Sequence, residues 1–328
     1  MRGLKIKKAP SLAELTSIRL GGTAIAEITL EDLHGFDALP EALARLGGQP
    51  VALGRGSNII AAGGELPLVL LRLGSERGGE LHSDKAETLR DYENEALFGA
   101  WGGMPLPLLV NQLSRGGFAG FSGLVGVPGS LGGAVAMNAG SFGMDIKGCL
   151  RRVLLFSPRL GLFTREAEEL DISYRHFAVS GLVEGRLNDS GSVADTSSSA
   201  SDGKGSVAGN WFLVVRAEFL CRKAEADLLR HEMEEFYARK SSSQPVGARS
   251  AGCVFKNHAA GPAGRLLEEA GFKGKALGGM MFSDLHANFL INTGRGTPAE
   301  AFELIELARR AVLEKCGAAL EPEVRLWA

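Results

Sequence analysis

The sequence predicts a protein of mixed helix and strand, organised as two domains that meet near residue 222. Three observations support this fold class. Apolar runs of strand length alternate with glycine-rich turns in the opening third of the chain. Glycine then dominates a long central stretch that has neither helical nor strand periodicity. After residue 222, amphipathic helices alternate with strands, which is typical of an α/β unit.

The opening third is predicted to form strands joined by one helix. Apolar runs at residues 24–30, 50–64 and 66–74 have the length of strands and are bounded by turn residues. Between the first two, residues 31–48 place leucine and alanine at helical spacing and end in a glycine pair, which is a helix C-terminal signal. The order strand, helix, strand fits an α+β or α/β protein.

The middle of the chain combines one helix with glycine-rich loops. A helix is expected at residues 106–115, with proline in its first turn and two glycines after its end. Residues 120–143 are expected to be ordered loops whose backbone approaches another group closely. Two strands joined by a turn near residues 158–161 follow. Residues 187–210, rich in serine and glycine, are expected to be a flexible insertion.

The last third is predicted to be a compact α/β domain. A first amphipathic helix is expected at residues 223–240, and its apolar face carries Leu228, Leu229, Met233 and Phe236. A second helix should end at Gly271, and a third should begin with Thr297 as N-cap. A strand at residues 322–328 completes the domain.

Composition and charge exclude several classes of function. Lys and Arg number 36 against 38 Asp and Glu, so the net charge of -2 creates no general attraction to nucleic acid or to an anionic membrane. No window approaches the ~18 consecutive apolar residues of a membrane-spanning helix. Four cysteines lie far apart, with no C-x-x-C pair and no signal peptide, which is typical of reduced thiols in the cytoplasm. A zinc motif H-E-x-x-H fails at Glu235, and no metal site is predicted.

Two glycine loops are candidates for binding a dinucleotide. Residues 53–60, LGRGSNII, follow a strand and offer backbone N–H groups around Gly54 and Gly56 that can bind a pyrophosphate. The loop lacks the third glycine of G-x-G-x-x-G, so a Rossmann site is disfavoured. Residues 123–140, GLVGVPGSLGGAVAMNAG, repeat glycine, but no Walker lysine follows. These residues leave the choice between a nicotinamide and a flavin open.

Eight ordered motifs give the chain a family resemblance. They are IRLGGTA, LGRGSNII, GLVGVPGSLGGAVAMNAGSFG, SYRHF, SAGCVFKN, AGRLLEEAGFKG, HANFLINTG and EPEVR. In this order the sequence resembles the UDP-N-acetylenolpyruvoylglucosamine reductase (MurB) family from about Ser17 to the C-terminus. The tyrosine loop that closes over the diphosphate in one subgroup is not evident, which indicates the shorter subgroup.

The resemblance implies an α+β flavoprotein with the vanillyl-alcohol-oxidase-like (PCMH-type) FAD-binding fold. Residues 1–75 and 76–222 would be two FAD-binding α/β subdomains, and residues 223–328 a C-terminal α/β substrate-binding domain. The implied reaction reduces the enolpyruvyl ether of UDP-N-acetylglucosamine to UDP-N-acetylmuramate for peptidoglycan synthesis. NADPH would be the reductant and non-covalent FAD the cofactor. A cytoplasmic monomer that binds a small-molecule substrate, and neither nucleic acid nor a membrane, is expected.

The resemblance also implies the site residues. Arg175 in SYRHF, Cys253 in SAGCVFKN and Glu323 in EPEVR would be catalytic. The FAD-binding residues would be Arg19, Gly21, Gly22, Gly54, Arg55, Gly56, Ser57, Asn58, Gly126, Val127, Pro128, Gly129, Ser130, Gly132, Gly133 and Asn138. The substrate would contact Lys256 and Asn257, with Gln244, Arg249 and His286 as further candidates.

The chain departs from the family at the proton donor, because Cys253 stands where serine is commoner. A thiol, with an ordinary pKa of about 8.5, is a stronger acid than a hydroxyl and can donate a proton while it is neutral. A nearby cation that lowered this pKa too far would leave an inactive thiolate. Glu323 can stabilise an enolate only if it is protonated or paired through Arg175 or a water.

Two alternative functions stay open. The protein could be another FAD-dependent oxidoreductase of this fold that acts on a sugar or alcohol, although the GRGSN loop lacks the histidine that tethers FAD in many such enzymes. It could also be a non-catalytic sugar-nucleotide-binding relative, which only the cysteine at position 253 and the insertion favour. Outside the family context, Cys253 fits a small buried hydrophobic residue.

Overall fold

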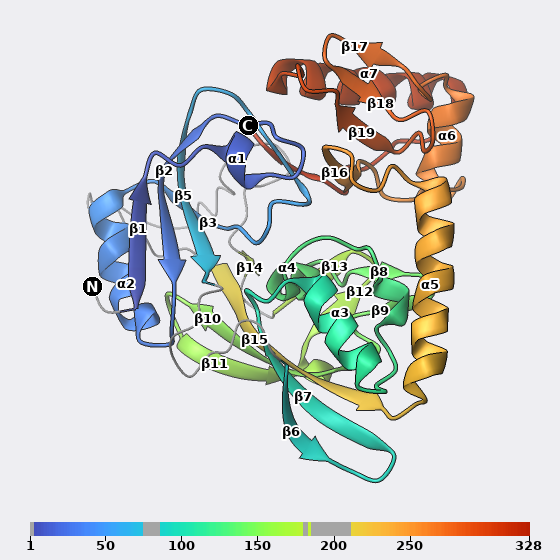
Figure 1. Ribbon diagram of the computed structural model, residues 1–328. Helices are drawn as coiled ribbons and strands as arrows, with labels where there is room; N and C mark the ends of the chain where they lie inside the picture. The colour runs from blue at the N-terminus through green and yellow to red at the C-terminus, as the bar shows by residue number, and fades with distance from the viewer. Residues whose placement is uncertain (1–2, 75–85, 180–182, 185–210) are drawn as a thin grey trace.

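The computed structural model describes residues 3–74, 86–179, 183–184 and 211–328. These residues form an N-terminal, a central and a C-terminal lobe (Figure 1). The expected insertion at residues 187–210 lies outside the described residues. The mixture of parallel and antiparallel sheets with helices confirms the predicted α+β class.

The N-terminal lobe is a four-stranded sheet with the order β1-β2-β5-β3. Its strands are β1 (Leu4–Lys8), β2 (Thr23–Leu30), β3 (Gln49–Ala52) and β5 (Glu65–Leu73). Short helix α1 (Leu12–Leu15) precedes β2. Helix α2 (Gly35–Leu46) buries Phe36, Leu39 and Leu43 under the sheet and ends at Gly47, whose φ is 66°. The predicted strand, helix, strand order is therefore confirmed.

The central lobe is built on a sheet with the order β11-β10-β15-β7-β6. Its strands are β6 (Glu87–Asp91), β7 (Glu95–Trp101), β10 (Leu150–Ser157), β11 (Gly161–Glu166) and β15 (Trp211–Arg222), and β14 (Val183–Glu184) pairs with β15. Helix α3 (Leu106–Arg115) has the predicted bounds. Strands β12 (Asp171–Ser173) and β13 (His176–Ala178), after the short 3₁₀ helix η2 (Ala167–Glu169), form a separate hairpin.

The glycine-dense stretch contains more regular structure than predicted. It contains the 3₁₀ helix η1 (Ser122–Leu124), helix α4 (Leu131–Ala136) and strand β8 (Gly140–Ser141). Strand β8 forms a hairpin with β9 (Met144–Asp145). Ser130 caps α4 by accepting a hydrogen bond from the Gly133 N–H at 3.4 Å. Because Leu131 and Val135 are fully buried, tertiary packing stabilises a helix that the glycines disfavour.

The C-terminal lobe pairs a small sheet with two helices. The sheet has the order β16-β19-β18-β17, with β16 (Ser250–Cys253), β17 (Ala276–Leu277), β18 (Met280–Phe282) and β19 (Phe289–Asn292). Helix α6 (Ala263–Glu269) is followed by Gly271, and α7 (Pro298–Cys316) begins with a capping box in which the Thr297 hydroxyl accepts from the Glu300 N–H. Both predicted helix boundaries are confirmed.

Helix α5 (Ala226–Ser243) runs along the central lobe and leads into the C-terminal lobe (Figure 1). Its predicted apolar face is partly wrong. Leu229 is buried and Met233 packs on the central core, but Leu228 is 69% exposed. The helix instead buries Lys240.

The last strand, β20 (Arg325–Trp327), corrects the expectation that it belongs to the C-terminal domain alone. It pairs in parallel with β4 (Ile59–Ala61) of the N-terminal lobe. Ile18, Leu20 and Ile60 likewise pack in one hydrophobic cluster with the C-terminal lobe. Within the part of the chain that the structure describes, no helix has the length and apolar character needed to cross a membrane.

Candidate functional site

Arg175 and Glu323 form an ion pair where the central and C-terminal lobes meet. Arg175 sits in the turn between β12 and β13, and its Nε donates to Glu323 Oε1. Both side chains are largely buried, at 19% and 11% exposure. Arg175 has a φ of 54°, a left-handed conformation that is strained for a side chain of this size. The structure thus brings together two predicted residues that lie 148 positions apart.

Cys253 ends β16 beside this pair. The chain segments are held by the N–H of Glu323, which donates to the Val254 carbonyl at 2.7 Å. Burial raises the pKa of the Cys253 thiol to about 12, and the Glu323 charge adds to the increase. Arg175 and a hydrogen bond with Asn288 oppose it. The raised pKa keeps a proton on the thiol at physiological pH, beside Arg175 and Glu323.

Burial also raises the pKa of Glu323, while Arg175 and Lys256 lower it. Protonation of this carboxyl therefore becomes easier as the site is closed to water. The Arg175 guanidinium offsets the negative charge when Glu323 is ionised.

The first glycine loop, residues 54–58, lies against the second. Ser57 Oγ donates to the Pro128 carbonyl at 3.4 Å. A Cβ atom on Gly54 would stand 2.2 Å from Ser130 Oγ, so a larger residue would displace the Ser130 hydroxyl that caps α4. Arg55, which lies between Gly54 and Gly56 in the chain, is exposed.

The second loop, residues 126–133, leads into α4. Gly126 and Gly129 have φ values of 72° and 128°, in the region that favours glycine. Val127, Gly129 and Gly132 are half-buried, and Pro128 and Gly133 are exposed. The two glycine loops touch, and partly exposed backbone in both can face a dinucleotide diphosphate. The residues present therefore fit a flavin nucleotide.

Asn138, predicted to bind FAD, uses its side chain within the protein. Its Nδ2 donates to Asp145 Oδ2 at 3.1 Å and to the Ser173 carbonyl at 3.0 Å, and its Oδ1 accepts from the Lys147 N–H at 3.0 Å. The buried amide thus anchors the strand that leads to Arg175. This is a structural use that the sequence motif did not reveal.

Arg19, Gly21 and Gly22 lie in the segment between α1 and β2. A Cβ on Gly22 would stand 1.9 Å from the Gly64 carbonyl oxygen, and one on Gly21 would stand 2.7 Å from Leu12 Cβ. The exposed Arg19 donates to the Glu14 carbonyl at 2.8 Å. Close backbone packing explains both glycines, and a role for these three residues toward FAD stays a prediction.

The predicted substrate residues are spread over the C-terminal lobe. Lys256 pairs with Glu321, and Asn257 Oδ1 accepts from the Ala263 N–H at the start of α6. His286 Nδ1 accepts from the Asn288 N–H at 3.2 Å, and burial lowers the pKa of its imidazole. Gln244 ends α5, and Arg249 precedes β16. Lys256 is the member of this set that acts electrostatically on Glu323.

Two further residues belong to the site, although the sequence analysis did not single them out. Tyr174 is 56% exposed, its hydroxyl hydrogen-bonds to the backbone of Asn257, and the Arg175 guanidinium lies 5.2 Å from its ring centre. Asn288 hydrogen-bonds to both backbone groups of Phe255 and so fixes the segment that follows Cys253. The sequence signal that could have identified them was their position inside two of the family motifs, Tyr174 in SYRHF and Asn288 in HANFLINTG.

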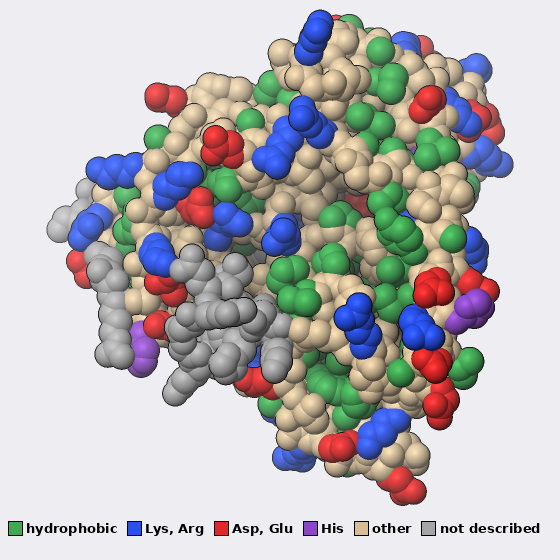
Figure 2. All heavy atoms as spheres, in the orientation of Figure 1, with side chains coloured by type: hydrophobic (Ala, Val, Ile, Leu, Met, Phe, Trp, Pro, Cys, Tyr) green, Lys and Arg blue, Asp and Glu red, His purple; other side chains and the backbone are tan. Residues whose placement is uncertain are grey.

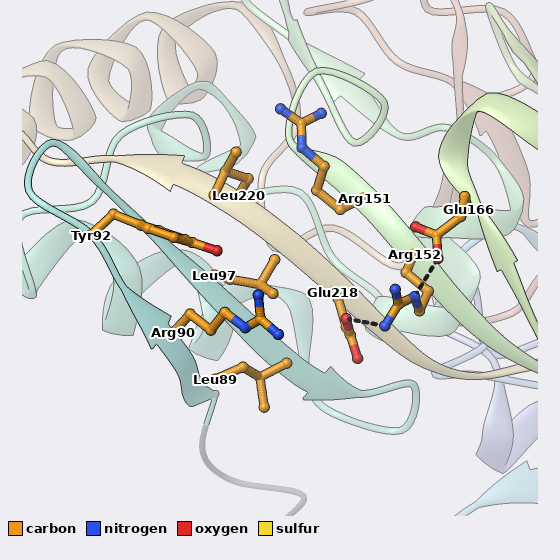
Figure 3. Close-up of a pocket in the computed structure, with 9 residues that line it drawn as sticks. All are labelled: Leu89, Arg90, Tyr92, Leu97, Arg151, Arg152, Glu166, Glu218 and Leu220. Atoms are coloured by element: carbon orange, nitrogen blue, oxygen red, sulfur yellow. Dashed lines mark hydrogen bonds and ion pairs between the residues drawn. The ribbon is translucent and has the colours of Figure 1, made fainter.

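The surface of this face is recessed where the lobes meet, with Lys and Arg side chains beside it (Figure 2). A separate hollow of about 420 Å³ lies on the central sheet and contains none of the predicted site residues (Figure 3). There Arg152 pairs with Glu166 at 2.6 Å and approaches Glu218 at 3.6 Å. Because none of the predicted catalytic residues lines this hollow, we do not assign the reaction to it.

Comparisons with known proteins agree over the whole chain. Residues 244–327 match the model of the UDP-N-acetylenolpyruvoylglucosamine reductase C-terminal domain. Curated proteins with this reductase name from Nitratidesulfovibrio vulgaris and Oleidesulfovibrio alaskensis are each 42% identical, over 324 and 323 residues, with 98% of both chains covered. The solved UDP-N-acetylenolpyruvylglucosamine reductase (MurB) of Thermus caldophilus is 27% identical, with a TM-score of 0.73 and coverage of 99% of this chain and 100% of that one.

Proposed function

The chain belongs to the UDP-N-acetylenolpyruvoylglucosamine reductase family, and from this we propose how its site works. The protein is an oxidoreductase of peptidoglycan synthesis that reduces the enolpyruvyl ether of UDP-N-acetylglucosamine to UDP-N-acetylmuramate. One observation carries the residue assignments that follow. Arg175, Cys253 and Glu323, from three separate segments, converge beside a pair of touching glycine loops.

The enzyme uses a flavin, which we propose to be FAD held without a covalent bond. Backbone N–H groups of residues 54–58 and, in the loop of residues 126–133, those of Gly126, Gly129 and Ser130 would bind its diphosphate. The N–H groups of Val127, Leu131, Gly132 and Gly133 donate within the protein. Neither loop contains a histidine or cysteine that could form a covalent link. When bound, the flavin supplies the hydride, received from NADPH, to the terminal carbon of the enolpyruvyl double bond.

Arg175 is proposed to stabilise the charge that develops on the substrate. Addition of a hydride to the terminal carbon leaves an electron pair on the α-carbon, delocalised into the carboxylate. A guanidinium held in place by Glu323 is preorganised to accept that charge, since its position is fixed before the reaction begins. Glu323 would hold the Arg175 guanidinium in position and, when protonated, would itself donate a hydrogen bond to the enolate.

Cys253 is proposed to complete the reduction by transferring its thiol proton to the α-carbon. One hydride and one proton are then added across the double bond, and a thiolate is left on Sγ. Solvent reprotonates this thiolate after product release. The raised pKa keeps the donor protonated until the substrate carbanion, a much stronger base, is formed.

Lys256 and Asn257 are proposed to bind the diphosphate and sugar of the substrate, with Gln244, Arg249 and His286 around them. A lysine ammonium would leave Glu321 for the more highly charged diphosphate. We propose that the enzyme works as a monomer, because one chain supplies every residue of this arrangement. The cytoplasm is the proposed compartment, which the four free thiols fit.

A spectroscopic titration of the purified protein tests the proposal. We expect flavin absorbance in the isolated protein, bleaching on addition of NADPH, and recovery on anaerobic addition of the enolpyruvyl sugar nucleotide. Recovery is the decisive step, since many flavoproteins are reduced by NADPH. A flavin that is bleached but stays reduced with this substrate would contradict the residue assignments and the reaction together.

A further inference from the structure

We propose that Lys240 is a positioning residue for the flavin, because its buried ammonium fixes the backbone at the start of the second glycine loop. The inference rests on the proposed binding of flavin by residues 126–133. Lys240 lies in the last turn of α5, is 4% exposed, and donates from Nζ to the Val125 carbonyl at 2.7 Å. Val125 directly precedes the loop.

The stem of Lys240 also shapes the next residue of the loop. Gly126 has a φ of 72°, and a Cβ atom there would stand 3.3 Å from Lys240 Cδ and 3.4 Å from the Tyr237 ring. The chain therefore turns tightly over the lysine stem at a position that only glycine occupies without strain. The Val125 carbonyl and the turn at Gly126 are therefore both held by contacts with α5.

A second contact makes α5 a continuous support for this segment. Glu232 Oε2 accepts a hydrogen bond from the Ser122 hydroxyl at 2.5 Å, eight residues before Lys240. Eight residues are about two helical turns, or roughly 12 Å along the axis. Both ends of the segment from Ser122 to Val125 are thus attached to one helix face, and the same helix continues toward the strand of Cys253.

The environment of Lys240 indicates a functional purpose for its charge. Among the residues that the structure describes, no carboxylate pairs with it, and its other neighbour is the face of Phe142 at 5.4 Å. Burial lowers the pKa of Lys240 to about 8. A buried ammonium with one neutral acceptor costs free energy in folding, so we expect it to be retained for an anionic ligand near the loop. The flavin diphosphate is the anion that the proposed function supplies.

Three variants of the holoenzyme test the inference. Lys240→Met keeps the stem and removes both donor and charge, and we expect flavin to dissociate about ten- to a hundredfold more readily on dilution, followed by flavin fluorescence. Lys240→Gln keeps a donor without the charge, and an intermediate loss is expected. Arg230→Met, on an exposed part of the same helix where Arg230 contacts Asp227, should match the wild type.

Two measurements separate positioning from general stabilisation. At the same saturating FAD concentration, the unfolding free energy of Lys240→Met should fall by no more than its weaker flavin binding accounts for, which is about 1.4 kcal/mol for each tenfold loss of affinity. Its visible flavin circular dichroism should differ from that of the wild type because the loop has shifted. Flavin affinity within twofold of wild type, or a loss of unfolding free energy larger than the measured loss of flavin affinity accounts for, would overturn the inference. A wild-type protein that binds no flavin would instead contradict the proposed function. If Lys240→Met does not fold, the flavin affinity of Lys240→Gln is compared with those of the wild type and Arg230→Met, and this comparison tests the inference.

Discussion

Asn58 donates a hydrogen bond from its side-chain amide to the Glu323 backbone carbonyl at 3.2 Å, which joins residues that lie 265 positions apart. The Asn58 carbonyl also accepts from the Arg325 N–H at 2.9 Å, so the contact extends the pairing of β4 with β20. The first glycine loop and the proposed catalytic carboxylate are therefore held by one backbone connection. A shift of either would be transmitted to the other.

Replacement of Cys253 tests the proton donor. Cys253→Ala should slow reoxidation of the reduced enzyme by substrate about 10²- to 10⁴-fold, the usual contribution of a positioned acid, while reduction by NADPH is unchanged. Cys253→Ser should recover part of the rate, since a hydroxyl can still donate. Single-turnover absorbance measurements separate the two half-reactions. An unchanged rate in Cys253→Ala would remove this residue from the mechanism.

The raised pKa of Cys253 predicts an unusual pH profile for its alkylation. An ordinary thiol ionises near pH 8.5, whereas a pKa of about 12 leaves roughly a thousandfold less thiolate at that pH. Iodoacetamide should therefore label Cys253 very slowly up to pH 9, as measured by peptide mass spectrometry. In Glu323→Gln, the loss of a negative neighbour should lower the thiol pKa and speed labelling. Equal labelling rates in the two proteins would refute the electrostatic link.

Arg175 should not tolerate replacement by lysine. Arg175→Lys keeps the positive charge but loses the planar guanidinium whose Nε contacts Glu323. We expect substrate-dependent reoxidation to fall about ten- to a thousandfold, in the range measured for the loss of one preorganised donor. Flavin content should stay at the wild-type level, which serves as the control. Full activity in this variant would show that charge alone suffices.

Asn138 is predicted to matter for stability. Asn138→Ala removes three hydrogen bonds and leaves the Ser173 carbonyl and the Lys147 N–H without this partner, so unfolding should become at least about 2 kcal/mol easier. The exposed Asn111, whose amide contacts the Pro107 carbonyl, gives the matched control Asn111→Ala, with a change below about 0.5 kcal/mol. Urea unfolding of the flavin-loaded proteins compares them. Equal midpoints would exclude a structural role.

The contact between the glycine loops predicts that Gly54→Ala weakens flavin binding. The new Cβ would stand 2.2 Å from Ser130 Oγ, so this hydroxyl must turn away from the Gly133 N–H that it caps, and a loss of about tenfold in affinity is expected. Gly63→Ala is the control, because the nearest atom to its Cβ is 3.9 Å away. Equilibrium dilution with flavin fluorescence measures both variants. Similar affinities for Gly54→Ala and Gly63→Ala would argue against loop contact as a requirement.

Local rules explain why much of the fold was predictable. Helix α3 has a proline before it and a glycine after it, and α7 begins with a threonine cap. Neighbouring residues therefore predict where these helices begin or end. The first glycine loop was recognisable because it directly follows a strand, and the second because glycine recurs through it. The eight motifs then identified the family, which the full-length relatives confirm.

The features that the sequence did not predict depend on contacts between residues distant in sequence. Helix α4 forms in a glycine-rich stretch because its apolar side is buried, and Leu228 stays exposed because the face of α5 is set by packing. No periodicity indicates that Asn138 holds Ser173, or that β20 pairs with β4. Such pairings are decided by the assembled lobes.

The sequence by itself determined the family, the secondary structure with local signals, and the residue types available for catalysis. Only the tertiary structure decided that Cys253 lies beside Arg175 and Glu323, that burial raises the pKa of its thiol, and that Lys240 is buried under the second glycine loop. The physical reason is that pKa values and ion pairs depend on burial and on the charges within a few ångströms. In this protein those neighbours come from segments far apart along the chain.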